Sequence, residues 1–196
     1  MIGEEVRAGM TPGLPPYIVH ESDRTLLAQL HRSYLAEAET LYREVMASGG
    51  RALALHTYAP RTVEVPVDAD IVQALRAAYR PAVYPTWTLR PEIDLITRDA
   101  EGHDLSPREL VAGLRAACSR HGFAVAENAT YHLHPATTGH LLAARYPGRV
   151  LCVEVRRDLL GAPWRPFRPS PVGPRKVARL ARPFVESLGA VAEQRR

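Results

Sequence analysis

The sequence predicts an α/β protein with three layers, in which a mostly parallel or mixed sheet carries helices on both faces. Short apolar segments alternate along the chain with longer segments whose apolar residues recur at helical spacing. No apolar run reaches the length of a membrane span, and no internal repeat is visible. We expect a single domain over residues 1–196, because this length suits one sizeable core.

The helices are predicted from periodicity and from their flanking residues. Ser22 or Asp23 can cap the first helix, whose apolar stripe ends before a Gly-Gly pair, and Asp68 or Asp70 can cap the second. Ser106 can cap the third helix, with a proline at the first helical position and Glu109 three residues after the cap. The predicted helices cover residues 24–48, 71–79, 107–121, 137–146 and 174–194.

The strands are predicted from short apolar runs that stop at polar or turn residues. They cover residues 52–55, 93–97, 123–126 and 150–155. Residues 1–19 are expected to form a short helical segment and a Gly/Pro loop, with a further strand upstream of them. Residues 161–174, which are rich in proline, are expected to lie on the surface.

Composition narrows the class of protein. The formal net charge of +4 comes almost entirely from arginines, which are scattered except in residues 165–182 and at 195–196. This distribution does not indicate a nucleic-acid surface and suits a small anionic ligand better. The start of the chain lacks the features of a secretory signal, so we expect a cytoplasmic protein with no membrane partner. Cys118 and Cys152 lie in apolar surroundings and are interpreted as reduced core residues.

Two strand ends carry the strongest chemical candidates. His56 follows the apolar run 52–55, where it can be a site residue or a structural one. Glu154 stands inside the apolar run 150–155, and a buried carboxylate needs a partner. Arg156 shares its strand face, so the pair is either an internal ion pair or a general base beside an anion anchor.

Two polar segments offer further ligands. The cluster 20–23 can supply metal ligands or simply cap the helix that follows it. The segment 128–134 contains His132 and His134, which face the same way if the segment is extended, and it is either a functional loop or a surface turn.

Four segments, in this order, resemble the N-formylglutamate amidohydrolase family. They are residues 53–58, 90–99, 122–131 and 152–160, the last with the sequence Cys-Val-Glu-Val-Arg-Arg-Asp-Leu-Leu. The resemblance extends over roughly residues 26–160. It implies a fold similar to that of the zinc carboxypeptidases and aspartoacylases, and the family's N-terminal strand and first metal-ligand turn have no counterpart in this sequence.

The resemblance also implies a metal site. In the family, Zn²⁺ is held by an early histidine, an acidic residue and a histidine at a strand end. The last of these corresponds to His56, and the acidic ligand to Asp23 or Glu21. Glu154 corresponds to the carboxylate that activates water. His20, His132 or His134 are candidates for the first ligand.

The implied activity is zinc-dependent hydrolysis of a small N-acyl amino acid or a related amide. Asn128 and Arg156 correspond to positions near the substrate, and Arg61 or Arg156 is expected to hold a substrate carboxylate. The alternative is a catalytically inactive member of the family that binds a small ligand or a protein. The sequence leaves the oligomeric state open.

Overall fold

The structure is a computed structural model, and it describes residue 14 and residues 17–66, 68–163, 165 and 168–193. The chain divides into two compact units, residues 1–40 with 61–88, and residues 41–60 with 89–196. The prediction of a single domain therefore stays a prediction. Most of the helical segment and loop predicted for residues 1–19 lies outside the described residues.

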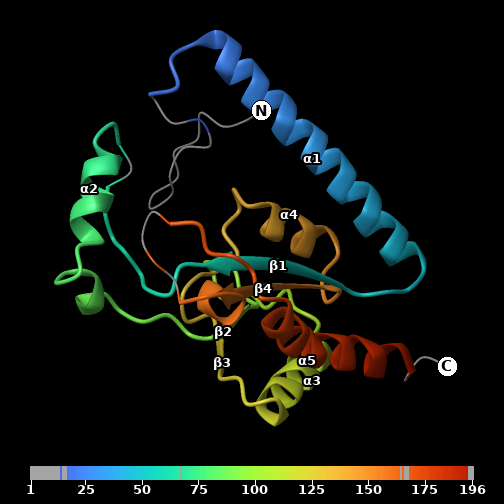
Figure 1. The fold of residues 1–196 in the computed structure, drawn as a ribbon. Helices are drawn as coiled ribbons and strands as arrows, with labels where there is room; N and C mark the ends of the chain where they lie inside the picture. Colours follow the sequence, from blue (N-terminus) through green and yellow to red (C-terminus); the bar gives the residue numbers. More distant parts are fainter. Residues whose placement is uncertain (1–13, 15–16, 67, 164, 166–167, 194–196) are drawn as a thin grey trace. The chain divides into compact units, whose positions relative to one another are not determined.

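A mixed four-stranded sheet forms the centre of the second unit (Figure 1). Its strands are β1 (Ala52–Tyr58), β4 (Val150–Arg156), β2 (Ile93–Ile96) and β3 (Val125–Glu127), in that spatial order. The pairs β1–β4 and β2–β3 are parallel, whereas β2 and β4 run antiparallel. The α/β class and the mixed sheet predicted from the sequence are thus confirmed.

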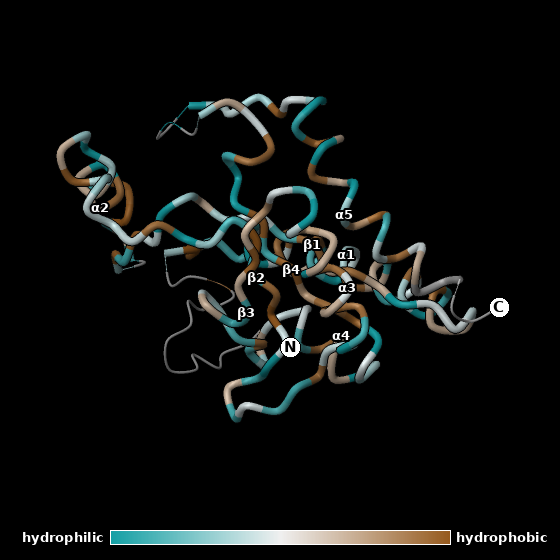
Figure 2. Tube along the Cα trace, turned by 90° about the horizontal axis from the view of Figure 1, so that it is seen from below, coloured by the Kyte–Doolittle hydropathy of each residue, from teal (hydrophilic) through white to brown (hydrophobic). Residues whose placement is uncertain are grey.

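Alternating side chains of β4 point to opposite faces of the sheet and build two separate cores. One face carries Val153, which packs with residues of α3 (Arg108–Arg120) and α5 (Pro174–Glu193). The other carries Cys152, which packs with α4 (Thr138–Arg145) and the end of α1 (Glu21–Ala47). Helices therefore cover both faces, and Figure 2 shows the hydrophobic strands between them.

The first core is the larger of the two and is the main source of stability in this unit. Leu95, Leu110, Leu114 and Leu151 are completely buried there. Burying one such side chain stabilises the fold by about 1.5–3 kcal/mol. These leucines come from β2, α3 and β4, so they fix the strands that carry the candidate site.

Local sequence explains most helix ends, with three differences. Gly122, at φ 73°, ends α3 as a glycine in the left-handed region should, and Thr137 accepts a hydrogen bond from the His140 amide at the start of α4. Ser106 instead bonds to Asp104, and α1 begins before Ser22. The side chain of Asp70 makes no capping bond at α2 (Ile71–Ala78).

β1 is longer and more exposed than the sequence predicts. The expected strand stops at Leu55, but its register with β4 continues to Tyr58, opposite Arg156. β1 is also one of the two edge strands of the four-stranded sheet, and Leu55 remains 57% exposed. His56 therefore lies within a strand, rather than at the mouth of the loop that follows it.

The first unit contains most of α1, together with α2 and the short 3-10 helix Tyr84–Thr86. The segment around Trp87 is tied to α2 and to the segment before it. The Thr62 amide donates to the Thr88 carbonyl, and the Trp87 indole donates to the Ala78 carbonyl. The predicted apolar stripe of α1 has exposed members at Leu26, Leu27, Leu30 and Tyr34.

Candidate functional site

Three ionisable residues form a row across neighbouring strands of the sheet. His56 on β1 pairs in register with Glu154 on β4, and Glu154 pairs in turn with Asp94 on β2. Directly opposed residues share one face of a sheet, so the three side chains lie on the same side. This is the face that α4 covers further along β4. The row is the candidate functional site.

Glu154 lies at the centre of this row. Its side chain is half-buried, and the buried Oε2 has no hydrogen-bond partner among the described residues. Burial raises the pKa of the Glu154 carboxyl above its ordinary value, while the charges of His56 and Arg90 oppose the rise. A carboxyl group with a raised pKa holds a proton more readily, which suits a group that accepts a proton and then returns it.

Asp94 is the functional candidate that sequence reasoning missed. It is completely buried, and its two oxygens accept hydrogen bonds from the amides of Ala129 (3.1 Å) and Thr130 (2.7 Å). Asp94 thereby fixes the loop after β3, and its charge adds to the rise in the pKa of Glu154. The sequence could have indicated Asp94, because an aspartate inside an apolar strand is a buried carboxylate that needs a partner, as Glu154 is.

Tyr58 and Arg90 also interact with the row, because the charges of Asp94 and Glu154 act on Tyr58 and the charge of Arg90 acts on Glu154. The Tyr58 hydroxyl donates to the Pro91 carbonyl at 2.7 Å, and burial raises the pKa of Tyr58, with a further contribution from the charge of Asp94. The Arg90 guanidinium lies over the Tyr58 ring, 5.1 Å from its centroid. Neither residue was singled out from the sequence.

The three residues predicted to bind substrate have internal partners. Arg156 donates to Asp158 at 2.8 Å and to the Arg90 carbonyl at 2.9 Å. Asn128 adopts φ 53°, and its side chain bonds to the amides of Thr97 and Arg98. These contacts give Arg156 and Asn128 a structural role, and their predicted contact with substrate stays a prediction.

Arg61 belongs to the first unit. Its guanidinium donates to the Trp87 carbonyl at 2.5 Å and lies over the Tyr84 ring, 5.8 Å from the centroid. Glu21 and Asp23, the predicted acidic metal ligands, occupy the first turn of α1 in the same unit. That Arg61 binds the substrate and that Glu21 or Asp23 binds a metal together with His56 therefore stay predictions.

One group of possible metal ligands is present elsewhere in the second unit. Donor atoms of Asp99, Glu101 and His103 all lie within 4.8 Å of one another, in the turn after β2. The Asp99 carboxylate accepts from the His103 amide and contacts the His103 ring at 3.0 Å. Within the described part of the chain, no such three-residue group includes His56.

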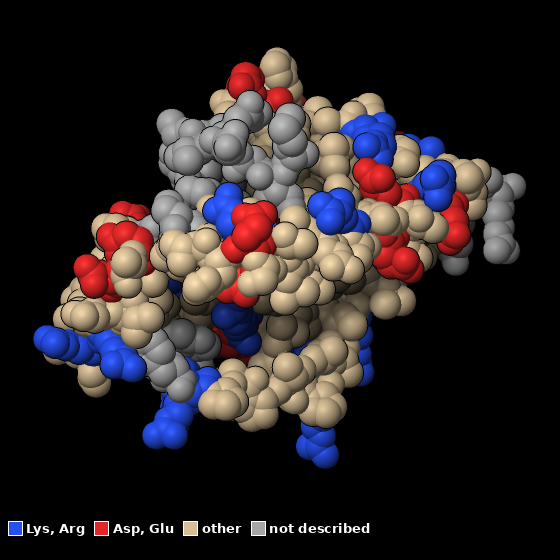
Figure 3. All heavy atoms as spheres, turned by 90° about the horizontal axis from the view of Figure 1, so that it is seen from above, with Lys and Arg blue, Asp and Glu red and all other residues tan. Residues whose placement is uncertain are grey.

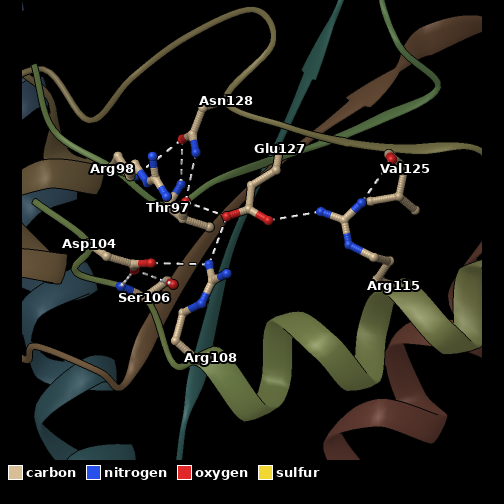
Figure 4. Close-up of polar contacts among 9 residues, drawn as sticks. All are labelled: Thr97, Arg98, Asp104, Ser106, Arg108, Arg115, Val125, Glu127 and Asn128. Atoms are coloured by element: carbon tan, nitrogen blue, oxygen red, sulfur yellow. Dashed lines mark hydrogen bonds and ion pairs between the residues drawn. The ribbon is translucent and has the colours of Figure 1, made fainter. Parts of the chain in front are cut away.

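Glu127 organises a second polar cluster at the end of β3 (Figure 4). Its carboxylate accepts from Arg108 at 2.7 Å, Arg115 at 2.8 Å and Thr97 at 3.0 Å. Burial alone would raise the pKa of Glu127, but the hydrogen bonds from Arg108 and Thr97 hold it below its ordinary value. The cluster joins β3 to α3 and the end of β2.

The remaining predictions concern cysteines, charge and membranes. Both cysteines are buried, which raises the pKa of the Cys118 thiol to about 11 and that of Cys152 to about 12, so the prediction that both are core residues is confirmed. Basic and acidic side chains are interspersed on the face drawn in Figure 3. Among the described helices, none is long and apolar enough to cross a bilayer.

Comparison with known proteins adds two similarities of shape. No family model and no curated protein matches the chain. The chain is similar to the crystal structure of an N-formylglutamate amidohydrolase from Ralstonia eutropha JMP134, with 19% identity and a TM-score of 0.48, over 85% of this chain and 52% of the other. It is also similar to a gene product from Agrobacterium tumefaciens, with 16% identity and a TM-score of 0.47, over 94% and 59%. The chain thus spans only a little more than half of each.

Proposed function

We propose that the second unit carries an amide-hydrolysing site in which Glu154 is the general base and acid. The observation that carries this proposal is the environment of the Glu154 carboxylate. It lies between His56 and Asp94 in the row, and its buried Oε2 is not used in any hydrogen bond among the described residues. A structural carboxylate in such a place would be paired, because burying an unpaired one is costly.

Amide hydrolysis requires one group that moves a proton twice. Glu154 takes a proton from the water that attacks the amide carbon, and it returns that proton to the nitrogen as the C–N bond breaks. Its raised pKa suits both steps. His56, the register partner of Glu154, lies on the same face of the sheet, where an imidazole can bind a metal or orient the substrate.

Zinc dependence is the finer part of the proposal, and it comes from the family resemblance. Catalytic zinc is usually held by three protein ligands. The described residues around His56 do not fit this requirement, because no three-donor group there includes it. We therefore assign no step to a metal, and Glu21 or Asp23 as additional ligands remain part of the proposal.

The proposed substrate is a small N-acyl amino acid or a related amide, as the resemblance implies. A second candidate function is binding of such a molecule without turnover. The lack of a three-donor group at His56 among the described residues favours this second candidate. The two differ in a single observable, which is release of the amine.

The test is an assay of the purified chain against a panel of N-formyl and N-acetyl amino acids, with and without added zinc. We expect Glu154→Gln to lower kcat/KM by about 10²- to 10⁴-fold, the usual contribution of a general acid or base. The control is Glu64→Gln, which changes an exposed glutamate of the first unit. Binding without amine release by the unmodified chain would favour the second candidate instead.

Metal analysis separates the two possible zinc positions. A zinc site at His56 requires that His56→Ala abolish stoichiometric zinc, whereas His103→Ala and the exposed control His31→Ala retain it. Zinc that is lost only with His103 would assign the metal to the turn after β2. That result would remove zinc from the proposed site.

A further inference from the structure

No described strand pairs with the outer edge of β1 (Figure 1). The Ala52 amide donates to the Arg149 carbonyl, so the backbone groups of the even-numbered residues of β1 point towards β4. The backbone N–H and C=O groups of Leu53, Leu55 and Thr57 point the other way. Among the described residues these groups have no hydrogen-bond partner, so the edge offers alternating donors and acceptors.

The sequence of β1 does not protect this edge. Sheet edges are usually protected by charged side chains, prolines, bulges or short strands. β1 pairs with β4 over 7 residues without a bulge, and it contains no Pro, Lys, Arg, Asp or Glu. The other edge strand, β3, is only 3 residues long and ends in Glu127, and the Arg115 side chain donates to its Val125 carbonyl at 3.2 Å. The edge of β1 is therefore the one that can accept a further strand.

The side chains of β1 are complementary to those of a second β1 that runs antiparallel to it and is centred on Leu55. On the face of the candidate site, His56 then lies opposite Ala54 of the second strand, and Tyr58 lies opposite Ala52. Each large side chain on this face meets a single methyl group. The strand therefore pairs with its own copy in this register without two bulky groups meeting on this face.

The same register satisfies the open backbone groups. Leu55 lies opposite its own copy, and Leu53 lies opposite Thr57 at both ends. Each of these opposed pairs exchanges two hydrogen bonds in an antiparallel ladder, which uses every outward N–H and C=O group of the three residues. The Leu55 side chain, 57% exposed in the single chain, is then covered by its counterpart. Apolar and β-branched residues that meet in this way stabilise a strand pair.

We propose that two copies of this chain associate through their β1 strands, which pair antiparallel about Leu55 and join two sheets into one. The interface is isologous, since the same residues contribute from both copies. His56 then becomes the diagonal neighbour of the partner's His56, at a Cα separation of about 7–8 Å. Both imidazoles lie on the face that carries Glu154, so each candidate site receives a side chain from the partner. The pairing depends on β1 alone and does not require amide hydrolysis.

Sedimentation equilibrium of the purified chain tests the association. We expect a dimer with a Kd of about 1–100 µM, because one strand pair is a small interface. Leu55→Lys should raise this Kd at least about 10-fold, since it removes an apolar contact and places two like charges opposite each other. The matched control is Val185→Lys on α5, 69% exposed, which should change the Kd less than about 2-fold.

A mixture of two variants tests the two-fold register. Leu55→Glu should weaken self-association as Leu55→Lys does. An equimolar mixture of the two places opposite charges across the dimer axis, so its Kd should return to within about 3-fold of that of the unmodified chain. Recovery on mixing would not occur if the substitutions had only disturbed the fold of each copy.

Nuclear magnetic resonance of the unmodified chain tests the position of the partner's imidazole. In a sample mixed from isotope-labelled and unlabelled copies, we expect an intermolecular NOE between the Ala54 methyl group and the ring of the partner's His56. Residues directly opposite in a non-hydrogen-bonded pair have Cα atoms about 4.5 Å apart. Dilution below the Kd should remove this signal.

A chain that stays monomeric up to about 1 mM would overturn the proposal. A dimer that Leu55→Lys leaves intact would also overturn it and would assign the interface to another surface. In a dimer, failure of the mixed variants to recover, or absence of the NOE between Ala54 and the partner's His56, would rule out the antiparallel register about Leu55. None of these measurements uses turnover, so this proposal and the proposed hydrolysis can fail independently.

Discussion

Replacement of Asp94 tests whether a buried carboxylate organises the loop after β3. Asp94→Ala removes the acceptor of two hydrogen bonds, those from the amides of Ala129 and Thr130. Hydrogen bonds to a charged group contribute about 1.5–3 kcal/mol each. We take the lower end, because the Ala129 side of the loop is exposed to water and because the variant also removes the charge of Asp94 beside Glu154.

The expected loss in the free energy of unfolding is about 3 kcal/mol for Asp94→Ala, and about half of that for Asp94→Asn, which keeps one oxygen. With a urea dependence of about 2 kcal/mol per M, the unfolding midpoint of the alanine variant should fall by roughly 1.5 M. Circular dichroism during urea titration measures both midpoints.

The control is Asp70→Asn, because Asp70 is exposed and its side chain makes no capping bond to α2. Surface substitutions of this kind change stability by less than about 0.5 kcal/mol. If Asp94→Ala falls within the same range as this control, the two amide bonds do not hold the loop. The anchoring of the loop after β3 by Asp94 would then be wrong.

Two further predictions concern the polar cluster and the helix packing on the opposite face. The pKa of Glu127 is lowered in the fold, so the contribution of Glu127 to the free energy of unfolding is complete above pH 4.5 and is lost as pH falls below this value. Glu127→Gln should lower the free energy of unfolding by about 1 kcal/mol at neutral pH and remove this pH dependence. If the stability of the variant falls with pH in the same way as that of the unmodified chain, the cluster does not have this role. A Cβ added at Gly139 would lie 2.8 Å from the Cys152 sulfur, so Gly139→Ala should destabilise the fold by about 1–3 kcal/mol. The double variant with Cys152→Ala should cost at least 1 kcal/mol less than the sum of the two single changes, whereas additive costs would show that the two residues do not meet.

Much of the secondary structure could be predicted from local pattern. The helix predicted for residues 71–79 is observed as Ile71–Ala78, and the strand predicted for 150–155 as Val150–Arg156. Helical periodicity and short apolar runs depend on neighbours along the chain, which the sequence displays directly. The predicted end of β1, at Leu55, was wrong, because the last residues of the strand are held by pairing with β4 and not by their own apolar character.

The candidate site was predictable only in part. Glu154 was found because a charge inside an apolar strand is unusual in any fold. Asp94 carried the same signal within β2, where all four residues are buried. Arg90 has no such local signal, since its position depends on the rings of Tyr58 and Tyr131, which are distant in sequence.

The sequence by itself determined the elements, the α/β class and the presence of one buried carboxylate that needs an explanation. Only the tertiary structure decided which residues surround that carboxylate. The order β1-β4-β2-β3 places His56 on one side of Glu154 and Asp94 on the other. Strand order depends on which helix faces pack together over long separations in the chain, and no local pattern in the sequence specifies it.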